Sequence, residues 1–456
     1  MNVSRHFVDI GQRRVQYRRC GSGPTLLMVH QSPRSSAEYH DLMLAWGAHF
    51  TCIAPDTPGF GQSDPLQDPE PSIDQFADGL VDLLDALGLH RVAAYGFHSG
   101  AIILVTALKR HPDRFSCLAA GGYAVWTRAE MALFSDKYMP PFEPQPYGEH
   151  LIWLWNRILE QSWFFPWFAP APDHRLSAVH DDVARVSSAV DEMLDSGAAY
   201  RAGYGAVLRA PRDIPPADAI TPPVLITAYD SDPLQPHIDR LGTMPKGWAA
   251  HKLATPAEHL SASLMFLIEH ATDPVPTLAE AAHEGFVRII AGGFDGLIHW
   301  RGTPGSSLHL HAPGRDLDLL GPVAGMAIDL PGHGLSDGLR CHDVDNPRDW
   351  QAIVDAISRH FGCTETIRAP APKGDPERLF PDLSPDRFGS HLTAAWAIVR
   401  AGHVFEPWYE ANAAHARDFD PAELDPANLA REHRALLRAN AARAYLLFLI
   451  QSEGEA

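Results

Sequence analysis

The chain has 456 residues, of which 45% are hydrophobic, so it is long enough for two domains with sizeable cores. Its formal net charge of −19 at pH 7 argues against nucleic acid or an anionic membrane as a partner, because both would repel it. We therefore expect a soluble globular enzyme that acts on a small molecule.

The sequence shows neither the pattern of a targeting signal nor that of a cysteine framework. The N-terminal stretch MNVSRHFVDIG lacks an apolar signal-peptide segment, and no apolar run approaches the length of a membrane span. The cysteines are odd in number and lack the spacing of a metal site or a disulfide framework. We expect a cytoplasmic protein without a cofactor. The five cysteines are Cys20, Cys52, Cys117, Cys341 and Cys363.

The first hundred residues alternate between strand and helix patterns. Residues 25–30 (TLLMVH) form a short apolar run, and residues 52–64 (CIAPDTPGFGQSD) form a strand that enters a Gly/Pro turn. Residues 73–87 carry apolar side chains at helical spacing, and residues 91–95 form the next strand. This alternation predicts an α/β fold with a mostly parallel sheet and helices on both faces.

The stretch YGFHSGA, residues 95–101, has the G-x-Nuc-x-G frame of a nucleophile elbow, with His98 at the position of the nucleophile. Glycines on either side of that position permit a tight strand-to-helix turn, which lifts one side chain above the sheet. Ser99 follows the elbow residue, so its backbone N–H would serve as an oxyanion donor.

These motifs, in this order and spacing, resemble the α/β-hydrolase fold. That family has an H-G-x-P oxyanion loop, here His30 to Pro33 with Gln31 in place of glycine, and a D-x-P-G-x-G-x-S-D turn, here DTPGFGQSD. The resemblance implies an oxyanion hole formed by Gln31 and Ser99.

The resemblance also implies a catalytic acid and a histidine farther along the chain. A late buried strand, PVLITAY, precedes Asp230 and Asp232, and Asp232 fits the family's G-x-x-D-P frame better, although Tyr229 replaces the glycine. Asp230 is the alternative acid. His259 occupies the family's histidine position, so we expect a catalytic triad of His98, Asp232 and His259, with the ring of His98 facing His259.

Residues 127–220 break the alternation with helical sequence that is dense in aromatic residues, which predicts a helical cap above the active site. Cap aromatics more often belong to a core, but the underside of a cap forms the roof of the pocket. We expect an apolar or aromatic substrate. The predicted substrate-binding residues are His30, Trp126, Trp153, Trp163 and Trp167.

An internal repeat covers the remainder of the chain. The pattern Y-G-x-H-L-x3-W from Tyr147 recurs as F-G-x-H-L-x3-W from Phe388, a shift of 241 residues without a gap. The turn DTPGFGQSD from Asp56 recurs as DLPGHGLSD from Asp329, and LLMVHQSP recurs as LHLHAPGR from Leu308. We therefore predict a truncated, degenerate second α/β-hydrolase-like copy.

The second copy lacks an elbow and the strands that would follow it. TETIRAPAP, residues 364–372, stands where the fifth strand is expected, without a G-x-Nuc-x-G frame. We predict a hydrolase domain over residues 1–273 and a non-catalytic copy over residues 274–456 with cap-like helices near 381–450, joined by a linker at 274–278. His309, His311 and His333 are expected to be structural. The two copies, or two chains, could pair about a two-fold axis.

Histidine at the elbow leaves several chemistries open. Imidazole could act as general base or acid on water, or as an atypical nucleophile that attacks an ester, thioester or other activated acyl group. A lyase or isomerase type of proton transfer, or cleavage of a lactone or C–C bond, would use the same site. His30, His98 and His259 with Asp232 could instead bind a divalent metal. A non-catalytic binding module is the remaining alternative.

Overall fold

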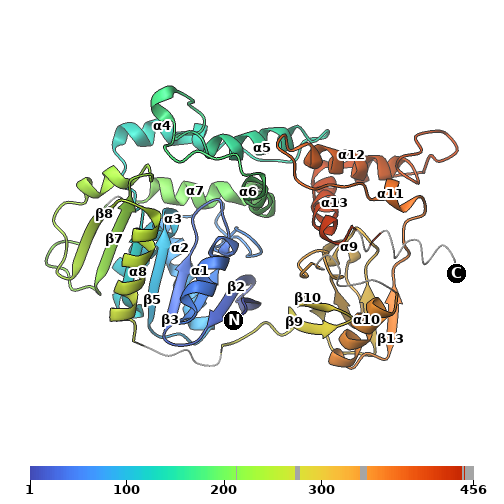
Figure 1. Cartoon of the computed structure of the whole chain (residues 1–456), viewed down its shortest axis with the longest axis horizontal. Helices are drawn as coiled ribbons and strands as arrows, with labels where there is room; N and C mark the ends of the chain where they lie inside the picture. The colour runs from blue at the N-terminus through green and yellow to red at the C-terminus, as the bar shows by residue number, and fades with distance from the viewer. Residues whose placement is uncertain (212, 273–277, 339–346, 444–445, 447–456) are drawn as a thin grey trace. The chain divides into compact units, whose positions relative to one another are not determined.

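A computed structural model describes residues 1–211, 213–272, 278–338, 347–443 and 446 of the chain (Figure 1). Two compact units form: Met1–Phe142 with Asn156–Ala281, and Glu143–Trp155 with the described residues from Ala282 onward. The predicted linker and the predicted boundary between residues 273 and 274 fall largely on residues 273–277, which lie outside the described residues.

The first unit contains an eight-stranded sheet in the order β1-β2-β4-β3-β5-β6-β7-β8. The first two pairings, β1 with β2 and β2 with β4, are antiparallel, and all later pairings are parallel. This arrangement confirms the predicted α/β-hydrolase fold. The strands are β1 (Ser4–Ile10), β2 (Arg13–Gly21), β3 (Thr25–Val29), β4 (Thr51–Pro55), β5 (Val92–Phe97), β6 (Phe115–Gly121), β7 (Val224–Tyr229) and β8 (Trp248–Leu253).

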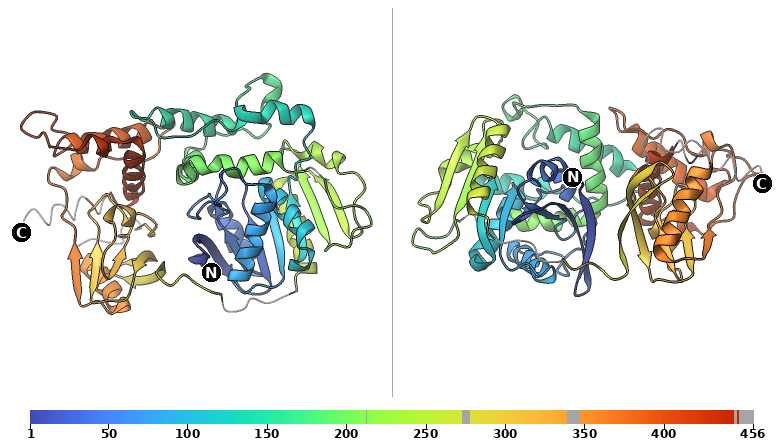
Figure 2. Two further views of the ribbon diagram at one scale, coloured as in Figure 1. Left: turned by 180° about the vertical axis from the view of Figure 1, so that it is seen from behind. Right: turned by 60° about the horizontal axis from the view of Figure 1, so that its bottom comes forward.

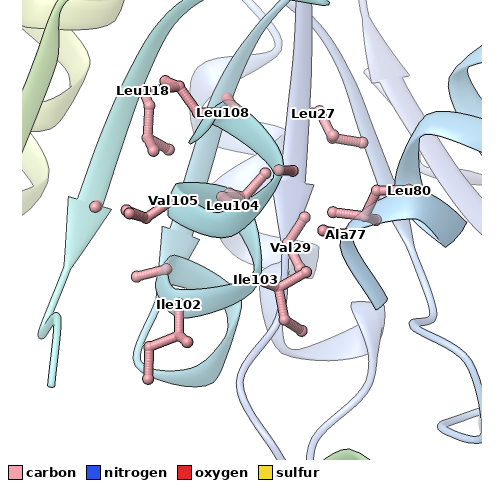
Figure 3. Close-up of a cluster of buried hydrophobic side chains, with 14 of the residues drawn as sticks. Leu27, Val29, Ala77, Leu80, Ile102, Ile103, Leu104, Val105, Leu108 and Leu118 are labelled. Carbon is pink, nitrogen blue, oxygen red and sulfur yellow. The ribbon is translucent and has the colours of Figure 1, made fainter. Parts of the chain in front are cut away.

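Central strand β3 shows why its sequence is apolar throughout. Leu27 and Val29 point into one core, which they share with α2 (Ile73–Ala86) and α3 (Ser99–Arg110), as Figure 3 shows. Leu26 and Met28 point into the opposite core, which includes residues of α1 (His40–Trp46) and α8 (Pro256–His270). Because successive strand residues face opposite sides, a strand with helices on both faces must be apolar at every position.

Four helices lie between β6 and β7, within the range in which we expect a cap: α4 (Arg128–Tyr138), α5 (Glu149–Gln161), α6 (Val183–Ser196) and α7 (Tyr200–Arg209). Side-chain caps start two of these helices. Thr127 and Glu130 form a capping box at α4, and the side chain of Asp182 accepts two N–H bonds at the start of α6. The C-terminal part of α5 and helices α4, α6 and α7 lie in the first unit.

The second unit contains a five-stranded sheet in the order β13-β11-β12-β10-β9. Read from β9, this is the order and the direction pattern of β1-β2-β4-β3-β5: two antiparallel pairings followed by two parallel ones. Helix α10 packs against one face of this sheet (Figure 2). The elements are β9 (Glu284–Ala291), β10 (Phe294–Gly302), β11 (Ser307–Leu310), α9 (Leu317–Leu320), β12 (Met326–Ile328), α10 (Pro347–Phe361), β13 (Glu365–Arg368), α11 (Pro376–Leu379), α12 (Ser390–Val404) and α13 (Pro426–Ala439).

The two sheets also match at the level of single hydrogen bonds. In the first, the carboxylate of Asp56 accepts a bond of 2.9 Å from the N–H of Gln62; in the second, Asp329 accepts one of 2.8 Å from Leu335. Buried His30 accepts a bond from the N–H of Thr57 at 2.9 Å, and buried His311 accepts one from Leu330 at 3.0 Å. The repeated sequence motifs therefore adopt the same turns.

Residues 143–155 pair with helix α12 inside the second unit in a reciprocal way. The indole of Trp155 donates to the carbonyl of Arg387 at 3.0 Å, and the indole of Trp396 donates to the carbonyl of Pro146 at 3.2 Å. Both indoles are buried. Each partner lies 241 residues from its counterpart in the repeat, so this contact has approximate two-fold symmetry.

Candidate active site

His98 lies on the predicted strand-to-helix turn, between the end of β5 and the start of α3. Its φ of 47° is the only positive value at a non-glycine position among the described residues. The flanking glycines are required by close packing: a Cβ on Gly100 would lie 2.0 Å from the carbonyl oxygen of Val29, and one on Gly96 would lie 2.7 Å from Leu104. The elbow therefore places an imidazole in a strained conformation of the type found at functional sites.

Asp232 is the acid that the fold brings to His98. The Nε2 of His98 donates to the Oδ1 of Asp232 at 3.2 Å, and the N–H of Leu234 donates to the same oxygen at 2.8 Å. Burial raises the pKa of Asp232, but the neighbouring charge and hydrogen bond of His98 outweigh it, so the pKa of this carboxyl lies below its ordinary value. The alternative acid Asp230 instead accepts a hydrogen bond from the side chain of Gln235.

This contact fixes which nitrogen of the imidazole carries a proton. A carboxylate only accepts hydrogen bonds, so the Nε2 of His98 carries a proton and the Nδ1 of the neutral ring keeps its lone pair. The His98 side chain is 28% exposed, whereas that of Asp232 is 1% exposed. The pair therefore combines a buried, charged acceptor with a ring that reaches a cavity.

The ring nitrogens of His259 are hydrogen-bonded to two hydroxyl groups rather than to His98 or Asp232. Its Nδ1 lies 2.7 Å from the hydroxyl of Thr227 and its Nε2 lies 3.0 Å from the hydroxyl of Tyr95. The ring of Phe97 stacks on His98 at 4.1 Å and contacts His259 edge-on at 5.5 Å, and Asp232 and His98 both influence the pKa of His259 through their charges. Burial lowers the pKa of His259 to about 4, which keeps it neutral near pH 7.

The predicted oxyanion loop also differs in detail. The N–H of Gln31 donates to the carboxyl of Glu38 at 2.7 Å, so it is not presented to a substrate. The next residue, Ser32, directs its N–H to the hydroxyl of Ser99 at 2.5 Å, beside His98. The N–H of Ser99 belongs to the first turn of α3, where backbone donors have no acceptor within the helix. Gln31, Ser32 and Ser99 all line the cavity beside His98, but the N–H of Gln31 is bonded to Glu38, which leaves the N–H groups of Ser32 and Ser99 as the candidate donors.

A cavity of about 200 Å³ lies next to His98. Its lining is mainly aromatic and aliphatic, with a few polar side chains: Gln31, Ser32, His98, Ser99 and Gln161. Such a combination of an apolar wall and a few polar groups is typical of small-molecule sites. The aromatic lining residues are Trp126, Phe134, Tyr138, Phe165 and Tyr204.

Of the five predicted substrate-binding residues, Trp126 alone lines this cavity. His30 is buried and bonded to Thr57. Trp153 lies in the second unit, Trp163 donates to the carbonyl of His180, and Trp167 lies against the guanidinium of Arg157. Tyr138 and Tyr204 were missed because nothing in the sequence shows which face of α4 or α7 turns toward the sheet.

His259 lines a separate cavity of about 480 Å³, together with Glu38, Tyr95 and Phe97. Burial raises the pKa of Glu38 to about 7, although Arg34 and the bonds from Gln31 oppose the shift. His30, His98 and His259 therefore have separate partners, and the described residues contain no cluster of three metal-ligating side chains.

The second sheet carries no counterpart of the elbow. Strand β13 pairs with β11 as β5 pairs with β3, and this register aligns Arg368 with Gly96 and therefore Pro370 with His98. Proline has neither a backbone N–H nor a reactive side chain. The second unit thus lacks both the elbow side chain and the donor at that position.

The model of the α/β-hydrolase fold family matches residues 24–261, which is more than half of the chain. The chain belongs to the α/β-hydrolase family. It is 28% identical over 171 residues to haloalkane dehalogenase 2 of Mycobacterium tuberculosis, a match that covers 37% of this chain and 57% of that protein. It is 32% identical over 132 residues to the 2-(acetamidomethylene)succinate hydrolase of Mesorhizobium japonicum, a match that covers 28% of this chain and 47% of that protein.

Among solved structures, the enol-lactonase from Burkholderia xenovorans LB400 is similar, with 18% identity and a TM-score of 0.44 over 59% of this chain and all of that one. The chain spans about half of the length of the curated relatives that it matches, 57% and 47% in these two cases. Among the described residues, no helix has the length and apolar composition needed to cross a membrane.

Proposed function

We propose that this protein hydrolyses a small apolar or aromatic carbonyl compound, such as an ester, lactone or thioester, with His98 as general base. The observation that carries the proposal is the hydrogen bond between the Nε2 of His98 and Asp232. The imidazole of His98 stands on the elbow and also lines an aromatic cavity. Asp232 orients the ring and stabilises the imidazolium that forms when Nδ1 takes a proton from water.

The remaining groups support the same chemistry. The N–H of Ser99, with that of Ser32 once it turns from the Ser99 hydroxyl, would stabilise the negative charge that develops on the carbonyl oxygen. Protonated His98 would then return its proton to the leaving group. His259 has a structural role in this proposal, because it bonds Thr227 and Tyr95 instead of the acid.

A nucleophilic role for His98 is the alternative within the same site. An acyl-imidazole is labile, so a covalent intermediate on His98 would gain less than one on serine. A lyase-type proton transfer would use the same pair, whereas a metal site is not supported by the separate partners of His30, His98 and His259.

We infer that the second unit is a degenerate copy of the first half of the same fold. The identical sheet order, the paired hydrogen bonds at the two turns, and Pro370 at the position of His98 support this. The reciprocal contact of Trp155 and Trp396 fits a former dimer contact that is now intramolecular.

The experiment is a hydrolysis assay on p-nitrophenyl esters, dihydrocoumarin and a phenyl thioester, with the wild type, His98→Ala and a control, His90→Ala, at an exposed histidine. We expect the wild type and the control to hydrolyse at least one compound and His98→Ala to lose about 100-fold or more in kcat/KM. Equal rates for all three proteins would contradict the role of His98, and no turnover of any compound by the wild type would favour a binding module.

The two roles of His98 are separated by mass spectrometry of the protein during turnover. A general base predicts no acyl adduct on the peptide that contains His98 after acid quenching within milliseconds. An adduct that forms and decays at the rate of turnover would identify His98 as the nucleophile.

A further inference from the structure

The second unit contains a cavity of its own, with a volume of about 730 Å³. It lies against the loop that follows β11, the segment that follows β13, and helices α12 and α13. One wall is apolar and is formed by Leu319, Phe380, Ile398, Val399, Trp408 and Leu436.

This cavity occupies the position that corresponds to the catalytic cavity of the first unit. Pro370 to Lys373 line it where the elbow would be, because the register of β13 aligns Pro370 with His98. Glu406 and Arg417 line it at the repeat positions of Phe165 and Leu176, which line the catalytic cavity. The second unit therefore has a cavity at the corresponding place but no reactive side chain at the elbow position. It also carries charged residues at two positions where the first unit has apolar wall residues.

Each of the three carboxylates on this cavity already has a partner. Glu432 lies 3.3 Å from Arg315 and 3.2 Å from His403, which also lies 2.9 Å from Glu423. A looser pair joins Arg417 and Glu406 at 3.9 Å. Two of the three carboxylates are thus paired with arginine, and the third, Glu423, is bonded to the imidazole of His403.

Lys373 is the cation that remains without a carboxylate. Its side chain is exposed and lines the cavity, and within the described part of the chain its ammonium forms no hydrogen bond or ion pair. The guanidinium of Arg417 is fixed on the same cavity by a bond of 3.1 Å from its Nη1 to the carbonyl of Gly402. An unpaired cation next to an apolar wall is complementary to one negative charge on an apolar body.

We propose that this cavity is a non-catalytic binding site for a small organic monocarboxylate. Its carboxylate is held by Lys373, with Arg417 as the second cation, and its apolar body lies against Phe380, Val399 and Trp408. The site binds its ligand without chemistry because Pro370 replaces the elbow residue. This inference is independent of the reaction proposed for the first unit.

The test is isothermal titration calorimetry of the full-length protein with benzoate, hexanoate, benzyl alcohol and benzylamine. We expect both carboxylates to bind with Kd below about 1 mM and the alcohol and the amine to bind at least about tenfold more weakly. Raising the ionic strength should weaken carboxylate binding.

Two variants locate the binding site. Lys373→Met should weaken carboxylate binding about fivefold, as expected for a partly exposed ion pair, whereas Lys246→Met, at an exposed lysine of the first unit, should leave it unchanged. Gly402→Trp should abolish binding by filling the cavity, since a Cβ at Gly402 meets no atom within 4 Å and the helix can accept it. Unchanged unfolding temperatures would show that both variants are folded.

Three results would overturn the proposal: no binding of either carboxylate to the wild type, equal binding of the alcohol or the amine, or carboxylate binding that Gly402→Trp leaves intact. The last result would place the ligand in another cavity, the catalytic one included.

Discussion

The Nε2 of His98 lies 3.2 Å from the Oδ1 of Asp232, so the acid of this site bonds directly to the elbow residue. In a serine hydrolase, the acid orients a separate histidine, which in turn activates the serine. Here the histidine stands on the elbow itself, and the proposed mechanism needs no relay through a further residue. We therefore propose a two-residue acid–base unit in place of a three-residue one.

Gly122 provides a sharp test of this contact. Its φ is +55°, and a Cβ there would lie 2.3 Å from the Cδ2 of His98 and 2.8 Å from the Oδ2 of Asp232. Gly122→Ala should therefore push His98 away from Asp232 and lower kcat/KM about tenfold or more, because misplacement of about 1 Å is costly. The assay is ester hydrolysis with circular dichroism to verify folding.

The matched control for that variant is Gly88→Ala. Gly88 has a similar φ of +68°, but a Cβ there meets no atom within 4 Å. It should carry the same backbone strain without the loss of activity. An equal loss in both variants would mean that strain alone, and not the position of His98, lowers activity.

His259 predicts a specific dependence of stability on pH. Its pKa is about 4 in the folded chain against an ordinary value of 6.5, because burial disfavours the charged ring. Between these values the unfolded chain binds more protons, so the stability should fall as the pH drops from 6.5 toward 4, by roughly 3 kcal/mol in total. His259→Gln should remove this part of the pH dependence.

The measurement is urea denaturation at pH 7 and pH 4.5, with the exposed His90→Gln as control. We expect the loss of stability between the two pH values to be smaller in His259→Gln by about 2 kcal/mol. The same loss of stability in the wild type and in both variants would show that folding does not lower the pKa of His259.

The reciprocal contact predicts that two distant tryptophans are equally important. Trp155→Ala and Trp396→Ala should each cost about 3–5 kcal/mol of unfolding free energy, because each removes a buried indole and its bond to a carbonyl. Trp153→Ala, at a partly exposed position of the same helix, should cost less. Urea denaturation of the full chain provides the values, and a near-zero cost for either buried tryptophan would contradict the symmetric role.

Much of the fold could be predicted from the sequence because its signals are local. The elbow glycines, the turn motif and the alternation of strands with helices each depend on nearby residues, and the repeat shift of 241 residues needs only a comparison of the chain with itself. The sheet orders of both units agree with these signals.

The arrangement of the site was less predictable because it depends on side chains that meet across the fold. His259 bonds Thr227 and Tyr95 rather than Asp232, and Thr255-Pro256-Ala257-Glu258 carries the signal of a helix start. Thr255 caps α8 through the N–H of Glu258, which places His259 inside the first turn of the helix rather than in a loop before it. The bond from Gln31 to Glu38 had no comparable signal, because it joins an oxyanion loop to a helix seven residues later.

The central claim is that His98 and Asp232 act as a pair and that His259 does not belong to it. The most direct measurement is kcat/KM for His98→Ala, Asp232→Asn and His259→Gln on one ester that the wild type hydrolyses. We predict losses of about 100-fold or more for His98→Ala and about tenfold or more for Asp232→Asn, and a loss of less than about threefold for His259→Gln. A loss in His259→Gln as large as that in His98→Ala, with the variant folded, would contradict the account and restore His259 to a catalytic triad.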